Sequence, residues 1–533
     1  MRRGKLGCTL SRFALALFAA GLPVVWAGPL LDSLQDPAVQ SELSRVSLAV
    51  PTLNRVTLLH LGRTALPARV AEINAAENYI FQIIPYWYDD DEGRAMLDRF
   101  RTRRTEHPGL DVRFITDWVS PAGTGDLFVS KQYKQLKLVS GGQLAYWNPP
   151  TWLKLWSGKL SRYHLHEKLI VVDGKKLIMG GLNVANEYLQ GGETREGWHD
   201  TDVLLEGPVA QEGASLFVKI WQLIRHIKKH KFFPDFSRDV VRVLDALFYS
   251  DAASNLDSPR ADDLSYRFFF WKVKVKLGIQ DYLANPFYFP RGLAEPADGV
   301  PVRLMYTNPL VNRDPKTLAY RSPLRDTMEL LGRYAKQELR LFVPYMTFSP
   351  EFKRWLTDLA RAGMRVEVIT NSLKSHDIGK IPYYAALSHY RELLEAGVRI
   401  FEWQGHEDLL ELEKANHCEI PRGWWPGRTI HTKAAVFDGE VWLVGAHNFN
   451  VRSEYFNSET MALIEDPLSA GQMRQVFEDD LDLAPADGYQ VKCGDQMLTR
   501  PRRVEEIDLA KFAAMEKKHR AKIRTYKKFQ NYF

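Results

Sequence analysis

Two stretches of the sequence have the same layout, LHEKLIVVDGKKLIMGGLN at residues 165–183 and IHTKAAVFDGEVWLVGAHN at residues 430–448. Each contains a histidine and a lysine two residues apart, an apolar run, the dipeptide Asp-Gly, a second apolar run and an asparagine. Asp-Gly between apolar runs is a tight-turn signal, so each stretch predicts a β-hairpin followed by the start of a helix. Two copies this far apart indicate two similar domains, because a solenoid repeats at a short period.

The repeat extends into the sequence before each hairpin. INAAENYIFQIIPYWYDD leads to LDVRFITD at residues 110–117, and GRYAKQELRLFVPYMTFSP leads to MRVEVITN at residues 364–371. Each copy predicts a helix, a strand ending in Pro-Tyr, a second helix and a second strand, an alternation typical of α/β sheets with crossover helices. We therefore expect two α/β sheet domains, at residues 28–298 and 299–490, that pack face to face and form one active site. Residues 491–533 are expected to form a basic tail.

The N-terminal segment has the pattern of a secretory signal. A basic start with Arg2, Arg3 and Lys5 precedes an apolar run at residues 13–26, and the pattern predicts a signal peptide at residues 1–27. An uncleaved membrane anchor is the alternative. We expect an exported protein, periplasmic or peripheral to the bacterial membrane.

Two cysteines, Cys418 and Cys493, follow the predicted signal peptide. In an oxidising compartment they could pair, and two buried thiols are the alternative, because sequence alone does not give their distance.

The charge of the chain is concentrated at its C-terminal end. The formal net charge is +6, and the residues from Arg500 onward carry eleven Lys/Arg against four Asp/Glu. The body is therefore a poor electrostatic match for nucleic acid, which favours basic residues across the whole binding face. The tail predicts a helix, which is either solvated or docked on anionic lipid through Phe512, Ile523 and Tyr526.

A segment between the two halves, roughly residues 226–298, has a second basic and aromatic pattern. Lys272, Lys274 and Lys276 alternate with valines next to a run of aromatic residues. This alternation predicts a strand with one apolar and one basic face. The strand is either half-buried in the ordinary way or a contact with a membrane surface.

The paired histidines and lysines indicate phosphodiester chemistry. The candidate catalytic residues are His166, Lys168 and Asp173 in the first copy and His431, Lys433 and Asp438 in the second. An imidazole can attack phosphorus or carry a proton, while an ammonium group balances the phosphate charge. Residues two apart on an extended strand share a face, so each histidine and lysine should project together. No metal or cofactor is expected, since the sequence has no HExxH motif and no CxxC pair.

These motifs resemble the HKD motifs of the phospholipase D superfamily over roughly residues 50–480. LLEAGVRIFEW, HTKAAVFDG and WHDTDVLLEGP are most similar to bacterial cardiolipin synthases of the short type, which lack an N-terminal transmembrane hairpin. The resemblance implies a phospholipase D-like fold and a phosphohistidine intermediate. It departs from the common Gly-Ser-x-Asn pattern, since Gly181 and Ala446 stand where serine is usual.

The resemblance also implies a role for each site residue. His166 would be the nucleophile and His431 the general acid and base. Four further side chains would bind the phosphate oxygens: Lys168, Lys433, Asn183 and Asn448. Glu459 would orient His431, and Asp200 would orient His166. For Asp173 and Asp438, a structural role at the hairpin turn and direct chemistry both remain open.

The function that these observations favour is transfer of a phosphatidyl group, and the closest resemblance predicts a cardiolipin synthase. The alternatives are a phospholipase D that hydrolyses phospholipid headgroups, a nuclease of the same superfamily and a binding protein without catalysis. Phospholipid substrates and a membrane surface are the expected partners. Neither nucleic acid nor an obligate protein partner is expected.

Overall fold

The computed structural model describes residues 28–117, 131–147, 164–190, 197–230, 295–309, 312, 320–416, 427–481, 490–493, 496–499 and 503–527. The predicted signal peptide, the predicted strand around Lys274 and Cys418 lie outside these residues, as does the side chain of Cys493. Within the described ranges, no helix combines the length and the apolar character that crossing a membrane requires.

The N-terminal half follows the predicted order of strands and helices. Its elements are α2 (Pro29–Leu34), α3 (Pro37–Val46), β1 (Thr52–His60), α4 (Gly62–Ala75), β2 (Tyr79–Ile83), α5 (Asp91–Glu106), β3 (Asp111–Asp117), α7 (Lys131–Val139), β4 (Leu144–Trp147), β5 (His164–Leu165), β6 (Leu169–Val172), β7 (Lys176–Gly180), α9 (Asn186–Leu189), β8 (Thr201–Glu206) and α10 (Val209–His230).

The C-terminal half repeats this order. Its elements are β9 (Val300–Thr307), α14 (Pro323–Tyr334), β10 (Glu338–Val343), α15 (Pro350–Arg361), β11 (Arg365–Asn371), α16 (Lys380–Glu395), β12 (Arg399–Trp403), α17 (Glu407–Asn416), β13 (Ala434–Phe437), β14 (Val441–Gly445), α18 (Val451–Tyr455), β15 (Asn457–Ile464) and α19 (Pro467–Leu481). The chain then forms β16 (Gln490–Cys493), β17 (Gln496–Thr499), β18 (Val504–Ile507) and α20 (Leu509–Tyr526).

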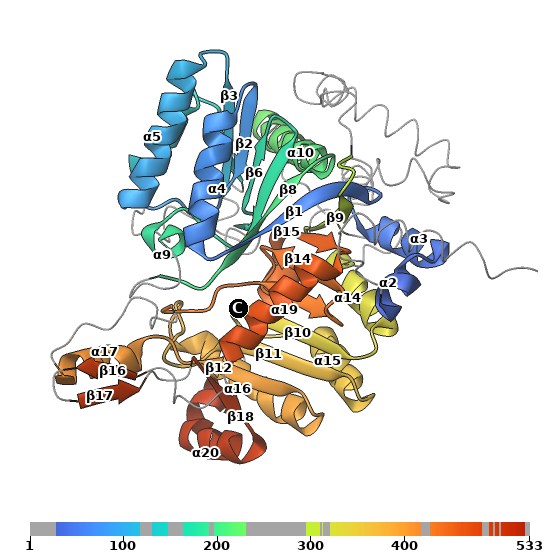
Figure 1. Cartoon of the computed structure of the whole chain (residues 1–533), viewed down its shortest axis with the longest axis vertical. Helices are drawn as coiled ribbons and strands as arrows, with labels where there is room; N and C mark the ends of the chain where they lie inside the picture. Colours follow the sequence, from blue (N-terminus) through green and yellow to red (C-terminus); the bar gives the residue numbers. More distant parts are fainter. Residues whose placement is uncertain are drawn as a thin grey trace, which may run out of the picture.

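The strand order confirms the internal duplication. The first half of the sheet runs β1-β8-β7-β6-β2-β3-β4 and the second runs β9-β15-β14-β13-β10-β11-β12, so each strand has a counterpart in the same place. Strands β2, β3 and β4 are parallel, as are β10, β11 and β12, and helices connect them. The two halves also join edge to edge, because β1 pairs with β9 in antiparallel fashion (Figure 1).

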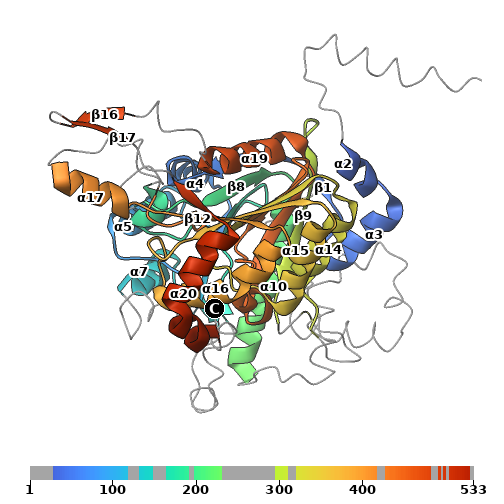
Figure 2. The same ribbon diagram turned by 90° about the horizontal axis from the view of Figure 1, so that it is seen from below.

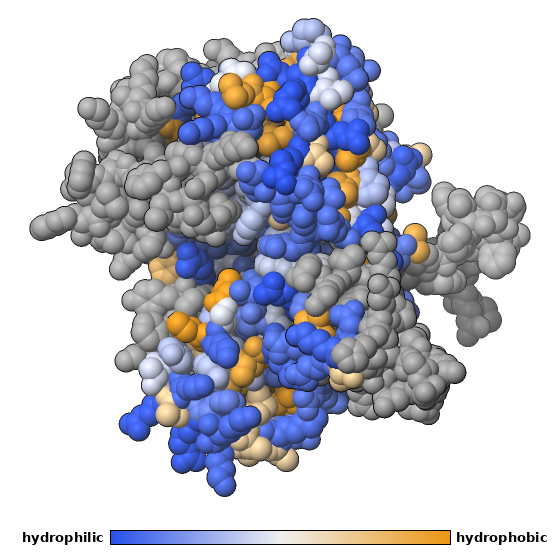
Figure 3. Space-filling view, turned by 90° about the vertical axis from the view of Figure 1, so that its left-hand side faces the viewer, coloured by the Kyte–Doolittle hydropathy of each residue, from blue (hydrophilic) through white to orange (hydrophobic). Residues whose placement is uncertain are grey.

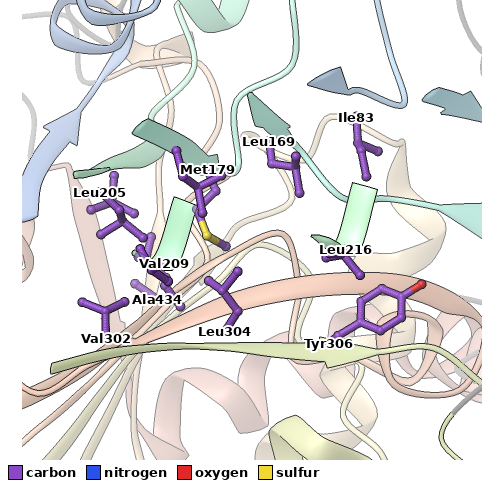
Figure 4. Packing of buried hydrophobic residues seen from close by; sticks show 14 of the residues in the cluster. Ile83, Leu169, Met179, Leu205, Val209, Leu216, Val302, Leu304, Tyr306 and Ala434 are labelled. Carbon is purple, nitrogen blue, oxygen red and sulfur yellow. The ribbon is translucent and has the colours of Figure 1, made fainter. Parts of the chain in front are cut away.

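A shared hydrophobic core holds the two halves together. In Figure 4, Leu169 and Met179 from the first half lie on one side, and Leu304 and Tyr306 from β9 lie on the other. These side chains are almost completely buried, and Leu216 of α10 packs among them. Because the apolar faces of both sheets are buried against each other, the halves form one packed body, as the face-to-face prediction requires.

The two Asp-Gly dipeptides form the predicted hairpin turns. Asp173 and Gly174 have φ angles of 52° and 64°, and Asp438 and Gly439 have 53° and 69°. Positive φ at both central residues is the type I′ geometry that matches the twist of the flanking strands, which explains the preference for Asp-Gly. The turns join β6 to β7 and β13 to β14.

Both ends of the described chain correct the predicted domain boundaries. Helices α2 and α3 lie in the range assigned to the first half, but they pack on α14 of the second half, where Leu30 and Leu43 are fully buried. The predicted tail completes the second half, since β18 pairs with β12 and α20 packs on α16 (Figure 2). Phe512 is 2% exposed, and Ile523 and Tyr526 pack against the same core. Phe512 is therefore buried against protein, and Ile523 and Tyr526 are partly buried there.

Candidate active site

The backbone of each motif histidine forms a hydrogen bond with the opposite half of the protein. The backbone N–H of His166 donates to the carbonyl of Ser458 at 3.0 Å, and that of His431 donates to the carbonyl of His199 at 2.7 Å. Both His-x-Lys segments therefore lie just before β6 and β13 and not within them, which differs from the expected regular strand. The reason is that these residues bond to the opposite half before joining their own sheet.

The two histidines are oriented by carboxylates of the opposite half. Nδ1 of His166 lies 2.8 Å from Oε2 of Glu459, and Nδ1 of His431 lies 2.6 Å from Oδ2 of Asp200. The expected pairing of each histidine with the carboxylate of its own half was therefore wrong. Strands β8 and β15 begin beside the opposite histidine. Asp200, just ahead of β8, and Glu459, the third residue of β15, therefore reach across. The site is complete only when both halves are present.

The carboxylates are themselves fixed by hydrogen bonds. The second oxygen of Glu459 accepts from the hydroxyl of Ser453 at 2.6 Å and from the amide of Asn457 at 3.1 Å. The second oxygen of Asp200 accepts from the backbone N–H of Thr201 at 2.8 Å. A carboxylate that accepts from Nδ1–H leaves Nε2 of the ring to attack phosphorus or to carry a proton.

The two lysines of the motifs are buried beside their histidines. Lys168 and Lys433 are 3% and 1% exposed. Nζ of Lys168 donates to the carbonyl of His166 at 2.8 Å, and Nζ of Lys433 donates to the carbonyl of His431. Burial lowers the pKa of Lys168 to about 7 and that of Lys433 to about 8. A bound phosphate would favour the charged form of both lysines.

Nζ of Lys433 also lies 2.6 Å from Nδ1 of His431. A single ring nitrogen cannot hold a proton for Asp200 and accept one from Lys433. We assign the proton to the bond with Asp200, because a carboxylate can only accept and because Glu459 makes the matching contact in the other half.

Burial lowers the pKa of both imidazoles, and that of His166 more strongly. Burial and the neighbouring Lys168 and Lys433 place the pKa of His166 well below its ordinary value. Burial and Lys433 also lower the pKa of His431, but the adjoining Asp200 opposes this. Burial raises the pKa of Glu459, whereas Lys433 and His431 outweigh burial and lower that of Asp200. The second histidine is therefore the one with the better support for a positive charge.

Asp173 and Asp438 belong to the framework of the fold. The carboxylate of Asp173 accepts from the backbone N–H groups of residues 77–79, just before and at the start of β2. That of Asp438 accepts from residues 336–338, just before and at the start of β10. Each lies at the opposite end of its strand from the motif histidine. The structure thus supports the structural alternative for these two residues over direct chemistry.

The asparagines predicted to bind phosphate are buried, at 2% exposed for Asn183 and 6% for Asn448. Within the described part of the chain, the side-chain oxygen of each has no hydrogen-bond partner. The structure explains why glycine and not the usual serine stands at position 181. A Cβ at this position would lie 2.0 Å from Oδ1 of Asp200, so a side chain there would displace the carboxylate that orients His431.

Asp117 and Asn371 are positioning residues that the sequence reasoning missed. Oδ2 of Asp117 accepts from the N–H of Leu165 at 2.7 Å, and Oδ1 of Asn371 accepts from that of Ile430 at 3.0 Å. Each therefore holds the residue before a motif histidine. The signal was present in the repeat, because LDVRFITD and MRVEVITN both end on these residues.

Aromatic rings surround the histidine of the second motif. The ring centroids of Tyr188, Trp198 and Tyr345 lie 5.4, 5.3 and 6.3 Å from that of His431. The first two residues come from the first half, and Tyr345 is the tyrosine of the second Pro-Tyr repeat. The His431 side chain is 6% exposed, compared with 15% for His166. These rings restrict the access of water to the second histidine.

The fold and the site together define a duplicated protein of the phospholipase D superfamily. A family model described as "Cardiolipin synthase, PLD-like domain" matches residues 70–221 and 332–481, which together exceed half of the chain and contain both motifs. The chain belongs to this family. Among the described residues, no group of three or more His, Cys, Asp or Glu side chains is arranged to hold a metal ion.

The chain is also similar to individual proteins at low identity. It is 24% identical over 321 residues to an uncharacterized protein of Helicobacter pylori, a match that covers 59% of this chain and 57% of that protein. It is 24% identical over 459 residues to a cardiolipin synthase of Geobacillus kaustophilus, covering 86% and 70% of the two chains. The solved structure of a phosphatidylserine synthase of Haemophilus influenzae has a TM-score of 0.54 at 15% identity and covers 93% of this chain and 99% of that one, which supports the fold.

Proposed function

We propose that this protein is a phosphatidyltransferase that works through a phosphohistidine, and that its product is cardiolipin. The observation that carries the proposal is the crosswise pairing of His166 with Glu459 and of His431 with Asp200. It gives two imidazoles of matched geometry beside two buried lysines, each with Nδ1 bound to a carboxylate and Nε2 available to attack or to carry a proton. Double displacement at a phosphodiester needs one nucleophile, one proton carrier and positive charge for the phosphate.

The proposed reaction has two steps. Nε2 of His166 attacks the phosphorus of a phospholipid, the bond from phosphorus to the headgroup oxygen breaks, and His431 gives that oxygen its proton. An incoming alcohol then gives its proton to His431 and attacks the phosphohistidine, and the electron pair of the breaking P–N bond returns to His166. Lys168 and Lys433 would balance the charge of the phosphate oxygens throughout, together with the amide groups of Asn183 and Asn448.

The assignment of the two roles to the two histidines follows from their surroundings. A nucleophile must be neutral, and the pKa of His166 is lowered well below its usual value by burial and by the two lysines. A general acid must carry a proton, and Asp200 supports a positive charge on His431. His166 is also the more exposed of the two rings.

The specificity for cardiolipin rests on similarity and not on the site itself. The family description and the Geobacillus kaustophilus relative both carry the name cardiolipin synthase. Transfer and hydrolysis differ only in whether an alcohol or water resolves the phosphohistidine. The aromatic rings of Tyr188, Trp198 and Tyr345 around His431 favour an alcohol, because they limit the access of water to the proton carrier.

We also propose that the protein works at a membrane surface. The support is a set of exposed basic residues along α20 and at its C-terminal end: Lys511, Lys517, Lys518, Arg520, Lys522, Arg524 and Lys527. Such residues are attracted to anionic lipid by about 1 kcal/mol each when they lie close to the surface. The described residues on the side shown in Figure 3 are mainly hydrophilic, with hydrophobic ones in small separate groups, so attraction by charge suits that side better than insertion.

Membrane attachment is tested by charge reversal and not by deletion, since α20 is part of the folded core. Lys517→Glu combined with Lys518→Glu should reduce binding to anionic vesicles at low salt, measured by co-sedimentation. Unchanged binding would show that α20 is not the membrane contact.

Export is a separate proposal, supported by the basic start and apolar run of residues 1–27. N-terminal sequencing of the protein from a periplasmic fraction should find Gly28 first.

The activity is tested by mass spectrometry of lipids after incubation with phosphatidylglycerol vesicles, with His166→Ala in parallel and single-stranded DNA as a control substrate. Cardiolipin that forms with the wild-type protein and is absent with the variant would support the transferase. Phosphatidic acid as the main product would mean that hydrolysis dominates. Cleavage of the DNA with no change in the lipids would contradict the proposal in favour of a nuclease.

A further inference from the structure

A carboxylate outside both motifs lies on the His431 side of the site. Asp377 belongs to the loop between β11 and α16, and its side chain is 8% exposed. The hydroxyl of Tyr345 donates to its Oδ2 at 2.6 Å. Its Oδ1 is buried and has no hydrogen-bond partner in the described part of the chain. Nδ1 of His376 lies 4.0 Å from Oδ1, which is beyond hydrogen-bond distance.

Asp377 is close enough to the reacting groups to act on them electrostatically. The ring of Tyr345, whose hydroxyl binds Asp377, lies 6.3 Å from that of His431. The negative charge of Asp377 opposes the lowering of the pKa of both His431 and Lys433, and it raises that of Tyr188 from the other half. The carboxylate thus lies near the point where the two halves meet.

The chemistry of Asp377 restricts what it can bind. A buried acceptor without a donor costs free energy, so such an oxygen in a native protein calls for a partner. A phosphate oxygen is excluded, because two anions repel each other. A donor is required, and the donor that must approach this side of the site is part of the alcohol that exchanges its proton with His431.

We propose that Oδ1 of Asp377 accepts a hydrogen bond from a second hydroxyl of the acceptor alcohol, so that the site selects polyol headgroups. The inference rests on the proposed function and specifies its acceptor. One hydroxyl of the polyol gives its proton to His431 and attacks phosphorus, and the P–N bond to His166 breaks. The second hydroxyl stays intact and donates to Asp377. Water and alcohols with one hydroxyl cannot make both contacts at once.

The experiment offers two acceptors that differ by a single hydroxyl. Phosphatidylglycerol vesicles are incubated with equal concentrations of propane-1,3-diol and propan-1-ol, and mass spectrometry measures the ratio of phosphatidylpropanediol to phosphatidylpropanol. A hydrogen bond to a charged group predicts that the wild-type protein prefers the diol by about ten-fold or more, beyond the statistical advantage of its second hydroxyl. Asp377→Asn should lower this preference by about ten-fold.

The matched control is Ile378→Ala, which changes an exposed neighbour in the same loop and should keep the wild-type ratio. The ratio is informative at any total activity, so a general loss of rate in the Asp377 variant does not obscure it. A wild-type ratio set by statistics alone overturns the inference, as does an equal loss of both products in Asp377→Asn. If the wild-type protein converts no lipid at all, the proposed function fails and not the role of Asp377.

Discussion

In the first half of the site, the histidine is paired with a glutamate whose pKa burial raises. In the second half, the histidine is paired with an aspartate, and neighbouring cationic groups lower the pKa of that aspartate. The surrounding contacts differ as well. Glu459 binds two side chains, Ser453 and Asn457, whereas Asp200 binds the backbone N–H of Thr201. The fold is duplicated, but the two histidines have different environments.

This difference shows how a symmetric fold supports an asymmetric reaction. Double displacement needs one imidazole that starts neutral and one that exchanges a proton with the alcohol. An ionised aspartate beside His431 supports the proposed proton carrier, while burial and the two lysines near His166 favour the neutral form of the proposed nucleophile. Because each carboxylate comes from the opposite half, a change in one half alters the chemistry of the other.

The largest expected effect comes from the histidines. His166→Ala and His431→Ala should each lower turnover of phosphatidylglycerol by about 10⁴-fold or more, since each removes an obligatory group. A substrate with a p-nitrophenyl leaving group distinguishes them, because this group departs without help from an acid. His431→Ala should then accumulate phosphohistidine, detected by intact-protein mass spectrometry, whereas His166→Ala should form none.

The detection of phosphohistidine in these two variants can also give the opposite result. Phosphohistidine that accumulates in His166→Ala and not in His431→Ala would exchange the roles of the two halves. The crosswise pairing would remain, but the interpretation of the pKa differences would be wrong. Asp377→Asn is a suitable control here, because it retains both histidines and should still form phosphohistidine with the activated substrate.

The next largest effect separates the two carboxylates. In Asp200→Asn, the backbone N–H of Thr201 can only donate, so the new amide must turn its NH₂ group toward Nδ1 of His431. The ring then has to move its proton from Nδ1 to Nε2, which is the wrong tautomer for the proposed proton transfer. We expect kcat to fall by about 10³-fold with little change in KM, because the ring loses its orientation.

In Glu459→Gln the conflict can be relieved. The hydroxyl of Ser453 can rotate to accept, and Asn457 can flip, since its Oδ1 is buried without a partner in the described residues. We therefore expect a loss of only about ten-fold in kcat. Equal losses in the two variants, measured by steady-state kinetics, would contradict the asymmetry.

The hairpin aspartates test the framework and not the chemistry. Asp173→Ala and Asp438→Ala each leave three backbone N–H groups without an acceptor, and we expect a loss of about 3 kcal/mol in the free energy of unfolding. The two losses should be similar, because the two contacts are equivalent. Urea denaturation measures them, and kcat of the folded fraction should stay within about three-fold of wild type. A loss of about 10³-fold in kcat with normal stability would instead show that Asp173 or Asp438 takes part directly in the reaction.

The duplication, the hairpins and the residues of both motifs could be predicted from the sequence, because they repeat with their spacing intact. The crosswise pairing could not. Aligning the halves places Asp200 opposite Glu459, but the alignment cannot say which strand ends lie beside which histidine, and this depends on how the two halves pack. The same limit applies to Asp377, whose loop has no recognisable copy in the described first half, and to α2 and α3, whose partners lie far away in the chain.

The smallest effect that the comparison predicts is a pH difference between the lysines. Burial lowers the pKa of Lys168 to about 7 and that of Lys433 to about 8. A lysine is charged below its pKa, so phosphate binding should weaken as the pH rises through these values, and kcat/KM should fall on the alkaline side. Lys168→Arg keeps its charge at all these pH values, which removes the step near 7 and leaves the one near 8.

Lys433→Arg should do the reverse and leave the alkaline step near 7. With kcat/KM of each variant normalised to its own value at pH 6, the two profiles should lie about one pH unit apart, which corresponds to about a ten-fold difference at pH 8.5. Normalisation is needed because the planar guanidinium does not reproduce the contacts of an ammonium group. If both variants keep the wild-type profile, the alkaline limb does not come from these lysines, and the electrostatic difference between the halves lies in the carboxylates alone.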